Sequence, residues 1–243
     1  MLNNDTVVER NDLSTIFFPA GATLASIKLF QFAVAQVKAG DKEFKTYKCG
    51  VFELADRVGV DYHCFSNKDN FIRLTHSLDS LVGEVINSNK KKVSTNIYLY
   101  SILRSDGNRI EFRLNNDLKK YLLFSREEDK RYIEIPLRVS KKISSSFSAR
   151  LYRYIMGITY QLRDGIVCKI EMSIVEIKSL FGVQNRSSYT AYNKFDKWVL
   201  NVAVDEVNLV SNLCVRYVPI RGKKNRVEGV LFFISRGDSH ARH

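Results

Sequence analysis

The sequence has few prolines, few histidines and no long apolar run, and each scarcity excludes a class of protein. Its 243 residues include only 3 prolines, which argues against long disordered linkers. No apolar stretch reaches the roughly 18 residues that a membrane span needs. The opening residues, MLNNDTVVERND, lack the basic and then apolar pattern of a signal peptide. We therefore expect a cytoplasmic protein that does not bind membranes.

Motifs that carry common enzyme chemistry are also missing. The four cysteines form no CxxC pair, and without a secretion signal we expect reduced, mostly buried thiols. Neither HExxH nor a Cys/His cluster with zinc spacing occurs, so no metal site is expected. The GxxxxGK[ST] phosphate loop is absent, and no two of the four histidines have the spacing that rolling-circle nicking enzymes require. The sequence predicts no catalytic residue, no cofactor and no enzyme activity.

Positive charge is what the sequence has in excess. Thirty-eight Lys and Arg stand against 26 Asp and Glu, which gives a formal net charge of +12. Such an excess attracts polyanions, and nucleic acid is the first candidate. The alternative is a basic protein with no such partner.

A weak internal duplication is the most informative pattern. Four segments recur in the same order after about 120 residues, a period typical of duplicated domains rather than of a solenoid. The pairs are 27–32 with 149–154, 54–60 with 177–183, 84–87 with 206–208, and 110–114 with 230–234.

Each copy predicts the same order of elements. The first copy predicts helix 24–38, strand 44–48, helix 51–58, long helix 68–87, strands 93–104 and 109–114, and a closing helix 115–124. The second predicts helix 146–161, strand 167–172, helix 173–181, long helix 187–208, and strands 213–219 and 227–235. Gly59 and Gly182 are expected to end the two short helices. This is the order of a winged helix, in which a helix-turn-helix is followed by a β-hairpin wing.

The expected fold class is therefore α+β, with two tandem winged-helix domains related by internal duplication. We expect an N-terminal tail over 1–22, a first winged-helix domain over 23–137 and a second over 138–243. The second is expected to be the main DNA-binding domain, and the first to provide dimerisation and auxiliary DNA contact.

The second long helix is expected to enter a major groove of DNA. At helical spacing one face is apolar and is predicted to be core: Tyr192, Phe195, Val199, Val202 and Ala203. The opposite face is small, polar and cationic, and suits base edges: Thr190, Asn193, Lys194, Lys197 and Asn201. Hydroxyls at the expected helix start can hold a phosphate: Ser187, Ser188 and Tyr189. The alternative is a solvated face, although such a face usually mixes charge signs. Trp198 is expected to pack in the core or between subdomains.

Other cations are predicted to contact phosphates. The second wing carries four of them within six residues: Arg221, Lys223, Lys224 and Arg226. In the first domain, Lys90, Lys91 and Lys92 follow the long helix and can hold phosphates, while Arg73 lies on the outer face of that helix, which is poorer in cations and is expected to read bases more weakly. For both groups the alternative is an ordinary solvated surface.

The first wing strand suggests self-association. Its segment 97–103, IYLYSIL, is apolar on both faces, whereas a wing needs only one apolar face. An uncovered strand of this kind invites pairing with a second chain, so we expect a homodimer. The alternative is that the N-terminal segment or residues 132–139 cover the second face.

The sequence resembles the Rep initiators of iteron-containing, theta-replicating bacterial plasmids. The resemblance is clearest over 189–200, continues through Ala203, Glu206 and Asn208 to 215–217 and 230–232, and includes 148–152. It implies a DNA-binding initiator of plasmid replication whose monomers bind direct repeats (iterons) and recruit host DnaA, replicative helicase and primase. It also implies dimers, joined through the first domain, that repress their own gene. Two other readings are a dedicated winged-helix transcriptional regulator and a primase-like enzyme.

Overall fold

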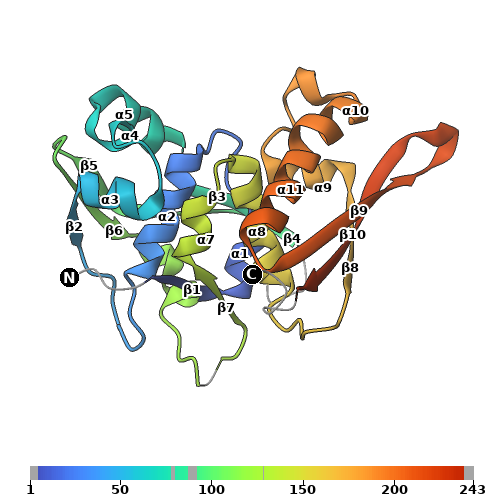
Figure 1. The fold of residues 1–243 in the computed structure, drawn as a ribbon. Helices are drawn as coiled ribbons and strands as arrows, with labels where there is room; N and C mark the ends of the chain where they lie inside the picture. Colours follow the sequence, from blue (N-terminus) through green and yellow to red (C-terminus); the bar gives the residue numbers. More distant parts are fainter. Residues whose placement is uncertain (1–4, 78–79, 87–91, 128, 238–243) are drawn as a thin grey trace.

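Two halves, each with a helix-turn-helix followed by a β-hairpin wing, make up the chain (Figure 1). The computed structural model describes residues 5–77, 80–86, 92–127 and 129–237. The first half contains β1 (Thr6–Arg10), α1 (Asn11–Ser14), α2 (Leu24–Ala35), β2 (Tyr47–Gly50), α3 (Val51–Val58), α4 (His63–Ser66), α5 (Lys68–Ser77), β3 (Ser80–Ile86), β4 (Lys92–Tyr98), β5 (Tyr100–Ser105), β6 (Arg109–Leu114), η1 (Asn116–Leu118), α6 (Lys119–Leu122) and β7 (Tyr132–Pro136). The second half contains α7 (Leu137–Lys142), α8 (Ser146–Ile158), β8 (Cys168–Ser173), α9 (Ile174–Phe181), η2 (Ser187–Tyr189), α10 (Tyr192–Phe195), η3 (Asp196–Leu200), α11 (Asn201–Val210), β9 (Leu213–Arg221), η4 (Lys223–Asn225) and β10 (Val227–Arg236).

The two three-stranded sheets have equivalent topology. Their strand orders are β2-β6-β5 and β8-β10-β9, with all pairs antiparallel. In each half the first helix of the helix-turn-helix ends at a glycine with positive φ, +65° at Gly59 and +67° at Gly182. Glycine adopts this left-handed conformation without the steric cost that other residues pay. The prediction of two winged-helix domains related by duplication is confirmed.

The predicted helix 68–87 is wrong in its second half. α5 ends at Ser77, and Ser80–Ile86 forms β3, which pairs antiparallel with β4. The spacing of Leu81 and Val85 fits one face of a helix, but alternation fits a strand as well, and β-branched residues favour the strand. The repeat assigned to 84–87 and 206–208 is therefore also wrong, because residues 84–86 lie in a strand and residues 206–208 lie in α11.

The predicted strand 93–104 is two strands in different sheets. Leu99 is buried at the break, with β4 before it in the β3-β4 hairpin and β5 after it in the wing sheet. The β3-β4 hairpin has no counterpart in the second half, where α11 leads directly to β9. The two apolar faces of segment 97–103 are thus explained in part by a change of sheet.

The N-terminal segment is built into the fold rather than trailing from it. β1 pairs with β7 along its whole length, from Thr6 opposite Pro136 to Arg10 opposite Tyr132. Glu9 is buried and accepts hydrogen bonds from Arg153 of α8, at 2.9 Å to Nε and 3.4 Å to Nη2. β1 and β7 pair with each other in a separate two-stranded sheet, not with β4 or β5.

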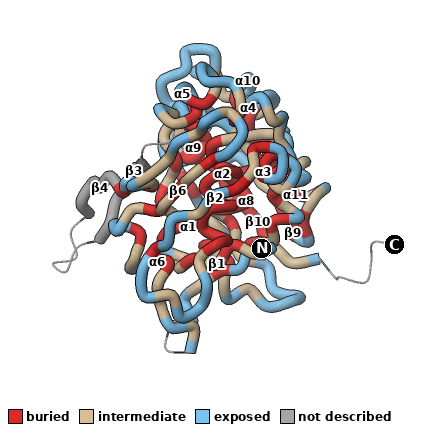
Figure 2. The backbone as a smooth tube through the Cα atoms, turned by 90° about the vertical axis from the view of Figure 1, so that its left-hand side faces the viewer, coloured by how far each residue is buried: buried red, intermediate tan, exposed pale blue. Residues whose placement is uncertain are grey.

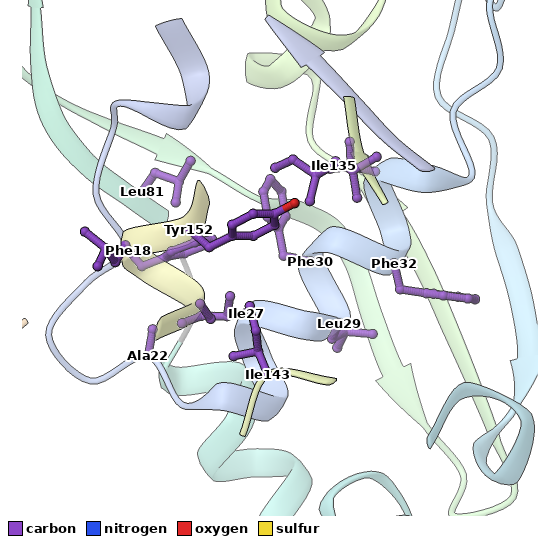
Figure 3. Packing of buried hydrophobic residues seen from close by; sticks show 14 of the residues in the cluster. Phe18, Ala22, Ile27, Leu29, Phe30, Phe32, Leu81, Ile135, Ile143 and Tyr152 are labelled. Carbon is purple, nitrogen blue, oxygen red and sulfur yellow. The ribbon is translucent and has the colours of Figure 1, made fainter. Parts of the chain in front are cut away.

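The core is continuous between the halves. In Figure 2 the buried parts of the tube concentrate around α2 and α8, which lie at the centre of the molecule. Figure 3 shows side chains of the N-terminal segment, α2 and α8 gathered in one cluster, with Phe18, Phe30 and Tyr152 among them. Both helix-turn-helix units are therefore attached to one core around α2 and α8, called the shared support below.

Candidate nucleic-acid interface

The second domain's long helix begins later than predicted. Its helical run, called the recognition helix below, covers residues 192–210 through α10, the π-helical turn η3 and α11. Ala191 is extended, and Ser187–Tyr189 forms a separate 3-10 turn that precedes the helix. The prediction that Ser187, Ser188 and Tyr189 form the helix N-terminus is wrong. The two serines remain exposed on the turn, and Tyr189 is half-buried.

The π turn changes which residues face the core. A π turn adds one residue to a turn of helix, and so rotates the residues that follow it. Phe195, Val199 and Ala203 are buried as predicted, and Leu200 is buried with them. Val202, predicted to be core, is 40% exposed. Trp198, also predicted to be buried, is 58% exposed, because it lies on the outer side of the π turn.

The outer face of the recognition helix is exposed and cationic as predicted. Thr190, just before it, and Asn193, Lys194, Lys197 and Asn201 are exposed. The Lys197 ammonium lies 4.9 Å from the centre of the Trp198 ring. The side-chain oxygen of Asn193 accepts the Lys194 backbone N–H at 2.9 Å, which orients the amide. The exposed Trp198 indole, predicted from the sequence to be buried, is a further candidate for DNA contact on this face, because an apolar surface suits a thymine methyl group.

A polar contact joins the recognition helix to the wing. The Asp196 carboxylate accepts hydrogen bonds from the hydroxyls of Tyr192, at 3.2 Å, and of Tyr217 on β9, at 2.7 Å. Burial, together with the nearby Asp196 carboxylate, raises the pKa of both tyrosines, so both hydroxyls remain donors. Asp196 therefore turns inward to hold the wing strand, and does not place a negative charge on the outer face.

The second wing ends in a tight cationic loop. Lys224 and Asn225 have positive φ, and the Gly222 N–H donates to the Arg226 carbonyl at 2.8 Å. Arg221 donates to the Asn225 carbonyl at 3.1 Å, so one of the four predicted cations also braces the loop. All four cations are exposed, and the ion pairs found in the described part of the chain involve none of them: Arg221, Lys223, Lys224 and Arg226.

The first domain presents fewer uncompensated cations. Arg73 is exposed on α5, but its guanidinium donates to the Asn70 side chain at 2.7 Å. On the first wing, Glu111 forms ion pairs with Arg104 at 2.6 Å and with Lys48 at 3.7 Å. Lys90 and Lys91 lie outside the described residues, and Lys92 begins β4.

Both helix-turn-helix units lie on the same side of the molecule. In Figure 1, α4 and α5 of the first domain and α10 of the second stand at the top, with β9 and β10 extending beside α10. Within residues 5–77, 80–86, 92–127 and 129–237 there is no group of acids, His and Cys that could hold a metal ion. In that same part of the chain, no helix is both long and apolar enough to cross a membrane.

Comparison with known proteins identifies the family. The model of the first winged-helix domain of the initiator replication proteins matches residues 6–156, and that of the second matches 173–234. No curated protein matches this sequence. Among solved structures, the Pi initiator protein in complex with iteron DNA matches over 97% of this chain and 98% of its own, with a TM-score of 0.69 and 17% identity. Because the two family models together cover most of the chain, it belongs to the initiator replication (Rep) protein family.

Proposed function

We propose that this protein is a sequence-specific double-stranded DNA-binding initiator of plasmid replication in the bacterial cytoplasm. Its binding sites are direct repeats (iterons) at the origin. The observation that carries the proposal is the exposed cationic face of the recognition helix beside a wing with four exposed cations. Family membership supports the initiator role, and the similar Pi protein was crystallised with iteron DNA.

Within this function, the second domain reads sequence. Asn193, Lys194 and Lys197 reach base edges, and Trp198 supplies apolar contact. The wing cations and the Ser187–Tyr189 turn hold phosphates. The first domain, which is expected to cover residues 23–137, adds weaker DNA contacts from Arg73 and the lysines at 90–92. It also joins two copies of the chain into a dimer.

A plasmid-maintenance assay tests the proposal. The gene is supplied with its flanking DNA, where the direct repeats are expected, on a plasmid that lacks any other origin, in a host with DnaA, replicative helicase and primase. Wild type should maintain the plasmid, and the double variant N193A/K194A should not. Binding to the repeats with no plasmid maintenance would instead indicate a dedicated transcriptional regulator.

A further inference from the structure

Two buried cations occupy equivalent positions in the duplicated halves. Lys28 of α2 and Arg150 of α8 are paired by the internal repeat, and they are 1% and 3% exposed. A buried cation is costly unless hydrogen bonds compensate it. Burial accordingly lowers the pKa of Lys28 to about 8 and that of Arg150 to about 10. The groups that accept their hydrogen bonds show which parts of the chain these two side chains connect.

Lys28 joins the first helix-turn-helix to the opposite half. Its ammonium donates to the Gly59 carbonyl, at the end of α3, and to the Lys141 carbonyl in α7, both at 3.1 Å. α7 is the segment that leads into α8, the first helix of the second winged helix. The Lys141 side chain returns to α3 through an ion pair with Asp56 at 3.0 Å.

Arg150 makes the corresponding contacts from the second half. Its guanidinium donates to the Leu180 carbonyl at 3.4 Å. Leu180 lies near the end of α9, which is the first helix of the second domain's helix-turn-helix. It also donates to carbonyls of the segment that leads into α2: Phe18 at 2.8 Å, Pro19 at 2.6 Å and Ala22 at 3.2 Å. Each cation thus ties its own helix-turn-helix to the segment before the other domain's first helix.

The turn glycines repeat the same pairing. A Cβ on Gly59 would lie 2.6 Å from the Lys141 carbonyl oxygen, and one on Gly182 would lie 2.9 Å from the Ala20 Cα. These obstacles are backbone atoms, which cannot move aside as a flexible side chain can. The two helix-turn-helix turns therefore contact opposite halves at backbone distance, on either side of the shared support.

We propose that Lys28 and Arg150 are positioning residues that set the distance and angle between the two helix-turn-helix units. They thereby determine the spacing between the two DNA segments that one chain accepts. One inserted base pair rotates the second segment by roughly 35° about the DNA axis, since a full turn takes about 10–10.5 base pairs. A pair of units held by these contacts cannot follow that rotation. This inference rests on the proposed function.

Spacing selectivity tests the proposal. Duplexes that bind wild type are selected from random DNA, and one or two base pairs are then inserted between the two protected segments. Wild type should lose roughly tenfold in affinity or more on insertion, about the cost of one poor contact. In R150M and K28M the loss should fall to within about threefold.

A glycine pair supplies the matched control. G182A should relax the spacing preference as R150M does, because its new Cβ meets the opposite half. G165A carries the same kind of backbone cost, since Gly165 also has positive φ at +79°, but its Cβ would meet nothing within 4 Å. It should keep the wild-type preference. R150K, which keeps the charge and loses the planar fork, replaces R150M if that variant does not fold.

A distance measurement keeps the test independent of DNA. Spin labels are attached at E53C on α3 and V175C on α9, with the native cysteines replaced. Wild type should give one narrow distance distribution, and R150M, K28M and G182A broader ones. Unchanged distributions with unchanged spacing preference would overturn the proposal. If wild type selected no DNA sequence, the proposed function would fail while the distances still decided the role of the two cations.

Discussion

Single side chains on the outer face of the recognition helix carry the proposed base contacts. N193A or K194A should each cost about 1–3 kcal/mol on the selected site and relax discrimination at one base pair. The control K42A removes an equally exposed lysine in the first domain, and should leave specificity unchanged. Fluorescence anisotropy with cognate and scrambled duplexes gives both values. Unaltered binding of N193A and K194A to both DNAs would remove this helix from the groove.

Lys28 should give the fold a characteristic pH dependence. Its pKa is lowered to about 8 by burial, from an ordinary value of 10.5. Between these values the unfolded chain binds more protons than the folded chain, so this residue makes stability rise with pH. From pH 7 to pH 9.5, wild type should gain about 2 kcal/mol relative to K28M. Urea unfolding at both pH values measures it. If the difference in unfolding free energy between wild type and K28M were the same at both pH values, Lys28 would have its ordinary pKa in the folded protein.

At the scale of elements, the second wing is expected to grip phosphates without reading sequence. K223A/K224A/R226A should weaken cognate and random DNA alike, and should flatten log K against log salt by up to about 0.9 per lost contact. The variant K42A/K120A/K130A removes three exposed lysines elsewhere and controls for net charge. A titration of binding from low to high salt shows the slopes. If the wing variant kept the wild-type slope, the wing would lie outside the interface.

Elements with strong local signals were predictable from the sequence, and elements set by tertiary packing were not. α9 has both signals: Ser173 and Glu176 form a capping box at its start, and Gly182 ends it. The hairpin turn between β5 and β6 also has a strong local signal, because Asp-Gly favours such turns and the Asp106 carboxylate accepts the Asn108 and Arg109 N–H groups. β3 was missed because a short apolar run fits a helix and a strand equally well.

The candidate site was predictable in composition but not in register. Helical spacing identified Asn193, Lys194 and Lys197 as exposed, because the first turns of the helix are regular. The same spacing placed Trp198 and Val202 wrongly, because no residue pattern predicts the π turn. The inward orientation of Asp196 depends on Tyr217, which lies in another element and is brought near only by the fold.

At the scale of the whole molecule, the duplication was predictable because its repeated residues are mainly core residues. The contacts between the halves were not predictable, because the acceptors of their hydrogen bonds are backbone carbonyls, which every sequence has. Lys28 and Arg150 stand inside the first repeated segment, yet only the structure reveals that each reaches the opposite half.

Self-association remains a prediction, and the structure sharpens its test. Tyr98 on β4 is 55% exposed, whereas the Tyr100 hydroxyl is buried, so Tyr98 is the residue to change. Y98D should shift a dimer toward monomer, because a charge opposes burial of this strand against a second chain. V175D on α9 controls for a charge placed at another exposed hydrophobic residue. Sedimentation at several concentrations reads out the state. A wild type that stayed monomeric at tens of micromolar would contradict the dimer.

One chain is proposed to bind each DNA repeat through two helix-turn-helix units on one side of the molecule. Hydroxyl-radical footprinting on the repeats that the protein binds shows whether both units contact the DNA. We predict that each repeat shows two protected segments on the same face of the duplex, about one helical turn apart, and that N193A/K194A abolishes protection of the segment bound by the second domain. Protection of a single segment per repeat, or protection that does not depend on sequence, would contradict this mode of binding.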